Sequence, residues 1–166
     1  MRTVVADASA IVEYLLRTEA ASPIGPIVTD PDTDVHVPAL CDVEVAAAIR
    51  RALLQQRITV ERAEEAVADY LDLPLIRHGH ERLLAPILRR RANFSAYDAT
   101  YVTLAEGLSA KLLSADRRLL RATRRHTKVR LAVSGNGRSR PRSLGSGHSG
   151  RHDLSERSEE LLEGEG

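Results

Sequence analysis

The hydrophobic pattern alternates between short apolar runs and longer stretches in which apolar residues recur at helical spacing. The short runs predict strands at residues 3–6, 35–37, 111–114 and 129–133, with a further short one at Leu75–Ile76. Helices are predicted after Asp7, over 39–55, from Thr59, over 81–91, from Ser95 to Gly107 and over 117–124. This alternation predicts an α/β fold with a mainly parallel central sheet that helices flank on both faces.

The stretch from Asn93 to Leu120 carries the clearest local signals. Ser95 is a predicted N-cap, and Asp98 three residues later completes a helix-start signature. Asp116 follows the strand at 111–114 directly and is placed to cap the next helix. Asp7 repeats that position after the first strand. Because parallel strands followed by helices end at one edge of the sheet, we expect Asp7 and Asp116 to lie at the same edge.

Composition changes at Ser134, where a Gly-, Ser- and Arg-rich segment begins and leads into an acidic end. This predicts one domain over residues 1–133 and a low-complexity, disordered tail over 134–166. The single Cys excludes an internal disulfide and fits a reducing compartment. The N-terminus has no apolar run typical of a signal peptide, and no stretch approaches the ~18 apolar residues of a membrane span. We therefore expect a cytoplasmic protein without a membrane partner.

Four acids form the candidate site: Asp7, Glu44, Asp98 and Asp116. Each also has an ordinary interpretation, since the three Asp residues are placed to cap helices and Glu44 lies on a predicted helix. Glu44 is surrounded in sequence by small apolar residues, however, and clustered carboxylates repel one another unless a cation compensates them. Oxygen ligands without paired His or Cys favour Mg²⁺ or Mn²⁺ over Zn²⁺.

At these residues the sequence resembles the PIN-domain ribonucleases, and most closely the toxins of VapBC-type toxin–antitoxin pairs. The resemblance runs from Val4 to about Val133 and rests on four pieces in order: VVADASAIVEYLL, PALCDVEVAAAIRR, SAYDATYVTLAEGL and LLSADRRLL. It implies a PIN-like three-layer fold in which Asp7, Glu44, Asp98 and Asp116 bind Mg²⁺ or Mn²⁺ and support RNA hydrolysis. Ser9 matches a small hydroxyl residue beside the first Asp, and Ser114 stands where the family usually has Thr.

The resemblance also implies partners. An endoribonuclease toxin of a type II system would act on tRNA, rRNA or mRNA and would have a cognate antitoxin whose segment fills the acidic groove. A homodimer is common in such proteins.

The net charge of +1 means that RNA affinity must come from local patches. The candidate RNA-binding residues are Arg89, Arg90, Arg91, Arg117 and Arg118. Aromatic residues make up only 3% of the chain, so recognition is expected to rest on the RNA backbone and shape more than on base stacking.

Other function classes remain open at this point. A housekeeping RNA-processing nuclease with the same fold would use the same four acids. An Asp-based phosphotransfer domain also places an Asp after its first strand, but it would want a second Asp at position 9, where this chain has Ser. A binding module that keeps the fold without catalysis would be suggested by the loss of one of the acids, and all four are present.

Overall fold

Four parallel strands form the centre of the protein, whose computed structural model describes residues 2–133. The strands are β1 (Arg2–Ala6), β2 (Thr33–Pro38), β3 (Leu75–His78) and β4 (Lys111–Leu113). Their order in the sheet is β3-β2-β1-β4, with every pair parallel. In the register, Val5 of β1 lies opposite His36 of β2 and Leu112 of β4. The inner part of β1 is almost fully buried because helices cover both faces, which explains its continuous apolar run.

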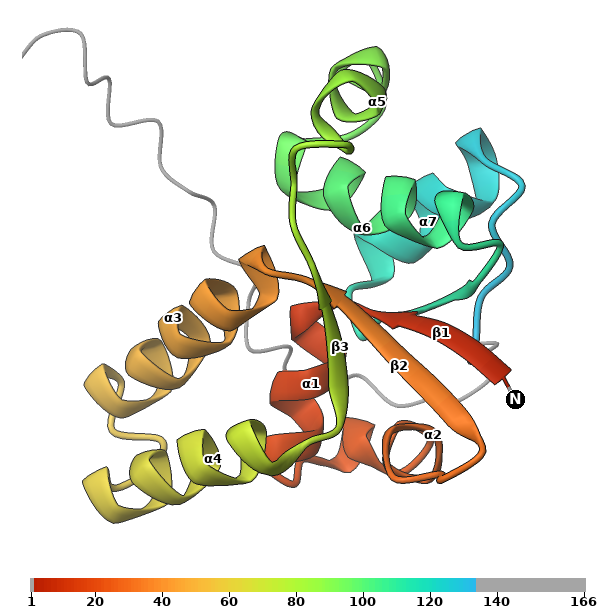
Figure 1. The fold of residues 1–166 in the computed structure, drawn as a ribbon. Helices are drawn as coiled ribbons and strands as arrows, with labels where there is room; N and C mark the ends of the chain where they lie inside the picture. The colour runs from red at the N-terminus through yellow and green to blue at the C-terminus, as the bar shows by residue number, and fades with distance from the viewer. Residues whose placement is uncertain (1, 134–166) are drawn as a thin grey trace, which may run out of the picture.

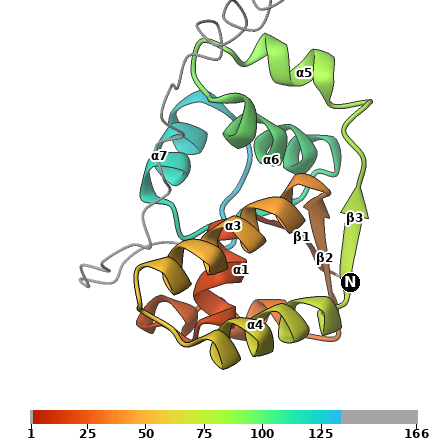
Figure 2. The same ribbon diagram turned by 90° about the vertical axis from the view of Figure 1, so that its left-hand side faces the viewer.

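Helices flank the sheet on both faces, as Figures 1 and 2 show. Their bounds are α1 (Ala8–Leu15), α2 (Gly25–Val28), α3 (Leu40–Leu54), α4 (Val60–Asp72), α5 (Leu84–Arg89), α6 (Ala96–Gly107) and α7 (Arg117–His126), with a 3-10 turn at Glu19–Ala21. One face carries α1 and α2, with α3 and α4 packed around α1. The opposite face carries α6 and α7, and α5 packs on α6. The expected three-layer α/β fold is confirmed.

The helix boundaries follow the capping signals in the sequence. The hydroxyl of Thr59 accepts a hydrogen bond from the Arg62 N–H at 3.2 Å, and that of Ser95 accepts from the Asp98 N–H at 3.1 Å. Asp116 caps α7 through its carboxylate. Each cap satisfies backbone donors that the first helical turn leaves unpaired. Local chemistry therefore fixes where α4, α6 and α7 begin.

The prediction of a strand at residues 129–133 is wrong. In its place the structure has a single parallel bridge between Leu131 and Leu112. Two backbone hydrogen bonds make it: the Leu112 N–H donates to the Arg130 carbonyl at 2.8 Å, and the Ala132 N–H donates to the Leu112 carbonyl at 2.9 Å. Because β4 is only three residues long, it offers too few groups for a longer ladder. The tail expected over 134–166 lies outside the described residues.

The order of the strands reverses between β1 and β4. The chain moves outward from β1 through β2 to β3 and then returns to the other side of β1 to form β4. The helix that follows β1 therefore covers one face, while the helix that follows β4 covers the other (Figure 2). In open α/β sheets, ligands bind at the carboxyl ends of the strands where the order reverses in this way. That position is the end of β1 and β4.

Truncation of Leu119 should test how firmly α7 is held at this edge. Leu119 is 1% exposed and anchors the inner face of α7. Leu119→Ala should lower the free energy of unfolding by about 2–5 kcal/mol, because it leaves a cavity in the core. Leu88→Ala is the control, since Leu88 is exposed on α5 and its loss should cost less than about 0.5 kcal/mol. Urea titration of both variants measures the difference, and equal losses would contradict the packing described here.

Candidate functional site

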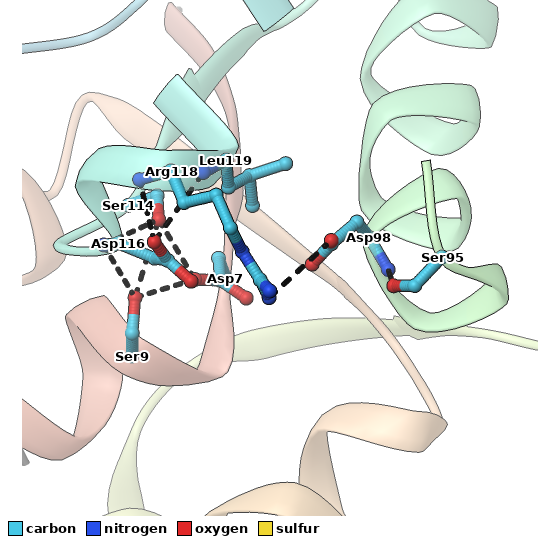
Figure 3. Close-up of polar contacts among 8 residues, drawn as sticks. All are labelled: Asp7, Ser9, Ser95, Asp98, Ser114, Asp116, Arg118 and Leu119. Carbon is cyan, nitrogen blue, oxygen red and sulfur yellow. Dashed lines mark hydrogen bonds and ion pairs between the residues drawn. The ribbon is translucent and has the colours of Figure 1, made fainter. Parts of the chain in front are cut away.

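The carboxyl ends of β1 and β4 are joined by two serine hydroxyls (Figure 3). Ser9 lies in the first turn of α1, and Ser114 directly follows β4. Both hydroxyls donate to the same oxygen, Oδ2 of Asp7, and the bond from Ser114 is 2.8 Å long. The two hydroxyls are themselves 3.2 Å apart. Both serines therefore orient the Asp7 carboxylate.

Ser9 also fixes the chain that leaves β4. Its hydroxyl accepts hydrogen bonds from the backbone N–H groups of Ala115 at 3.0 Å and Asp116 at 3.2 Å. The Asp116 N–H lies 3.0 Å from the Ser114 hydroxyl as well, and the Asp7 N–H donates to the Leu113 carbonyl at 2.8 Å. The two strand ends thus form one hydrogen-bonded unit, which sets Asp7 and Asp116 beside each other.

Asp7 does not act as a helix cap, although it occupies the N-cap position of α1. Its backbone is extended, with φ −78° and ψ 149°, but its side chain makes no cap hydrogen bond. The carboxylate is buried and faces the two serines instead. Burial raises the pKa of Asp7 to about 6, the serine hydrogen bonds oppose this rise, and the charges of Asp116 and Asp98 add to it. The structure therefore removes the capping explanation for Asp7.

Asp116 does cap α7, but the cap leaves part of its carboxylate available. The N–H groups of Arg118 and Leu119 donate to Oδ1 at 2.7 and 3.3 Å. Both bonds end on that one oxygen, so capping uses only Oδ1. A second role as a cation ligand is therefore compatible with the cap.

Asp98 lies in the first turn of α6, on the opposite side of the site from α7 (Figure 3). Partial burial raises its pKa, and the neighbouring Asp116 charge acts in the same direction. The Ser95 hydroxyl and the guanidinium of Arg118 act in the opposite direction. Nη2 of Arg118 is 3.9 Å from Oδ2 of Asp98.

Glu44 reaches the site from α3 and is half-buried. The hydroxyl of Tyr101, a buried residue of α6, donates to Oε2 of Glu44. Burial raises the pKa of Glu44 to about 7; the Tyr101 hydrogen bond opposes the rise, and the charges of Asp7 and Asp98 reinforce it. Sequence alone does not single out Tyr101, because its spacing on the predicted helix is that of an apolar core position. Its place three residues after Asp98, roughly one helical turn further, was the available signal.

The four predicted acids thus come from four elements and influence one another electrostatically. As the side chains stand, no three His, Cys, Asp or Glu groups among residues 2–133 are gathered closely enough to hold a metal ion. Glu44 is turned to Tyr101, and Asp98 faces Arg118. The donor set nevertheless fits a hard divalent cation. It consists of carboxylate oxygens. Burial raises the pKa of Asp7 and Glu44, the neighbouring acidic charges add to the rise, and a bound cation would offset both effects.

The candidate arginines divide into two groups. Arg90 is a structural residue, since it donates to the Thr103 hydroxyl at 3.2 Å and pairs with Glu106, both on α6. Arg89 and Arg91 are exposed near the end of α5. Arg117 and Arg118 are exposed at the start of α7, next to Asp116, and Arg121, Arg124 and Arg125 continue the exposed basic face of that helix. The basic surface that begins at the acids is therefore on α7.

The chain is similar to proteins of one family. The model of the PIN domain family matches residues 4–125. Ribonuclease VapC12 of Mycobacterium tuberculosis is 34% identical over 130 residues, which cover 78% of this chain and 99% of that protein. Ribonuclease VapC3 of the same organism is 38% identical over 120 residues, 72% of this chain and 86% of that protein. The crystal structure of PAE2754 from Pyrobaculum aerophilum shares the fold, with a TM-score of 0.58 and 19% identity, over 78% of this chain and 83% of that one.

Asp7→Asn should stabilise the metal-free protein, and increasingly so as the pH rises. The folded state raises the pKa of Asp7 from 3.8 to about 6. The buried carboxyl therefore favours folding fully below about pH 4, and this contribution is lost as the pH rises through 6. The advantage of Asp7→Asn should be near zero at pH 4 and reach the order of 1–3 kcal/mol at pH 7.

Urea titrations in EDTA at pH 4, 5.5 and 7 measure this trend. The matched control is Asp72→Asn, an exposed acid of α4, which should change the free energy of unfolding by less than about 0.5 kcal/mol at each pH. A difference for Asp7→Asn that stays flat or falls between pH 4 and 7 would contradict the electrostatics described above.

Proposed function

The chain belongs to the PIN domain family, and from this membership we propose that it is a divalent-metal-dependent endoribonuclease, the toxin of a type II toxin–antitoxin pair. The observation that carries the proposal is the buried Asp7 carboxylate, which lies at the joined ends of β1 and β4. The negative charges of further acids act on it. Such an arrangement is unfavourable for folding alone and useful for binding a cation.

In the proposed site, Asp7, Glu44, Asp98 and Asp116 would hold Mg²⁺ or Mn²⁺. A divalent ion held in this way lowers the pKa of bound water and offsets negative charge on the phosphate. Ser9 and Ser114 keep the Asp7 carboxylate in one orientation through their hydrogen bonds. Asp98 on α6 is more exposed than Asp7 and is our candidate for orienting the attacking water. Tyr101 positions Glu44.

We place the RNA backbone along α7. The exposed face of this helix presents Arg117, Arg118 and Arg121 in its first turns, and the helix begins at Asp116. A phosphate bound there would be adjacent to the acids. Lys and Arg contacts to phosphates give affinity that does not depend on sequence and that falls with salt. Arg90 has no part in this surface, because Glu106 and Thr103 hold it against α6.

The proposed partners follow from the family. The relatives are named VapC ribonucleases. From that name we propose a cognate antitoxin and an RNA substrate for this chain. We also propose a homodimer. A housekeeping nuclease with the same site is the alternative, and the antitoxin separates the two, because only the toxin requires one. No helix among residues 2–133 is long and apolar enough to cross a membrane.

Substitution of the acids should abolish RNA cleavage without unfolding the protein. Asp7→Asn and Asp116→Asn each remove a charge at nearly constant volume, and Asn caps α7 about as well as Asp does. Cleavage of total RNA in Mg²⁺ should fall by a factor on the order of 10² or more in each variant, and EDTA should stop the wild-type protein.

The control for this assay is Glu65→Gln, which removes an exposed acid of α4, a helix that carries none of the four acids. It should cleave RNA at the wild-type rate. A protein with Asp116→Asn that retains full cleavage in Mg²⁺ would reduce this residue to a helix cap and overturn the proposed site.

Expression of the chain alone should arrest bacterial growth, since a free endoribonuclease destroys RNA. Co-expression with the product of the adjacent small gene should restore growth, and the Asp7→Asn protein should be harmless without it. Growth curves after induction provide the measurement. A wild-type protein that cleaves RNA in vitro but leaves growth unaffected would favour the housekeeping nuclease.

A further inference from the structure

Arg118 contacts two of the four acids. Its backbone N–H, in the first turn of α7, donates to Oδ1 of Asp116 at 2.7 Å. Its guanidinium extends from α7 towards α6, where Nη2 lies 3.9 Å from Oδ2 of Asp98 (Figure 3). One residue therefore joins the two sides of the site, through its main chain on one side and its side chain on the other.

The side-chain contact is loose. Guanidinium and carboxylate groups in a charge-assisted hydrogen bond approach to about 2.7–2.9 Å, well inside the 3.9 Å found here. The Arg118 side chain remains 61% exposed, whereas that of Asp98 is 23% exposed. Partly exposed pairs of this kind contribute little to stability, so a stronger partner displaces them easily.

Other arginines of the protein show what a fixed contact looks like. Arg90 is mostly buried and has two partners on α6, Thr103 and Glu106. Arg77 lies against both oxygens of Asp42, at 2.9 and 3.3 Å, and over the ring of Tyr70. Arg118 has neither burial nor a two-point contact to its carboxylate.

We propose that Arg118 is a displaceable counter-ion of the site. It compensates Asp98 while no cation is bound, and a divalent ion that takes Asp98 as a ligand releases the guanidinium to the RNA backbone. The inference rests on the proposed metal site and adds to it a competition between this residue and the metal. Arg118 lies in the first turn of α7, on its exposed basic face. Its released side chain is therefore already beside the proposed path of the phosphates.

This exchange couples the two ligands. Metal binding makes an additional cation available to RNA, and by linkage bound RNA then favours metal binding to the same extent. The device works only if the pair with Asp98 is weak, as its length and exposure indicate. A tight pair would exclude the metal, and an arginine that pointed away from the acids would be indifferent to it.

The test is Mn²⁺ binding to the protein at low salt, measured by electron paramagnetic resonance of the free ion. Arg118→Gln removes the competitor and should bind Mn²⁺ about two- to fivefold more tightly than wild type, the factor that corresponds to a partly exposed ion pair. Arg118→Lys keeps the charge and should stay within about twofold of wild type. Arg121→Gln is the matched control one helical turn further along α7, and its Mn²⁺ affinity should equal that of wild type.

Unchanged or weaker Mn²⁺ binding by Arg118→Gln would overturn the inference. Equal tightening by Arg121→Gln would overturn it as well, because the effect would then reflect total charge and not the pair with Asp98. A wild-type protein that binds no Mn²⁺ would remove the proposed metal site itself, and the inference with it. That outcome is distinct from wild-type binding that Arg118→Gln leaves unaltered.

Discussion

The buried carboxylate of Asp7, held by the hydroxyls of Ser9 and Ser114, is the interaction on which the site depends. A carboxylate in such a place is costly, as its pKa of about 6 shows, and two hydroxyl donors reduce that cost without removing it. The same hydroxyls accept N–H groups from the chain beyond β4. One small network therefore retains a charge in the interior and ties together the two strands that carry the site.

Topology explains why this network lies where it does. The sheet order β3-β2-β1-β4 makes β1 and β4 neighbours that are more than a hundred residues apart in sequence, and their following helices leave towards opposite faces. Groups from both faces of the sheet approach this edge: Glu44 comes from α3 and Asp98 from α6. In a sheet whose strands followed their sequence order, β1 and β4 would lie at opposite ends, and Asp116 could not lie beside Asp7.

Sequence reasoning reached the parts of this arrangement that depend on local signals. Asp7 follows β1 directly and Asp116 follows β4 after two residues, and parallel topology then brings them together. Thr59, Ser95 and Asp116 have the side chains that caps require. The bond between Tyr101 and Glu44 joins α6 to α3 across 57 positions, and no periodicity in either helix reveals it. The strand expected at 129–133 failed for a related reason, because β-propensity cannot show that β4 offers it only three residues to pair with.

Capping and the proposed metal binding, which appear as rival explanations in the sequence, are compatible in Asp116. This residue caps α7 with one carboxylate oxygen, and in the proposed function the other oxygen would serve as a ligand. Asp7 occupies a cap position but makes no cap hydrogen bond, because its side chain faces the serines. A protein that needed only stable helices would gain from an Asp7 that capped α1 and lay in solvent. The orientation it adopts is unfavourable for stability and leaves a negative charge at the carboxyl ends of β1 and β4. That cost has a physical rationale when a cation binds there, and the chain itself supplies a loosely held guanidinium, that of Arg118, beside Asp98.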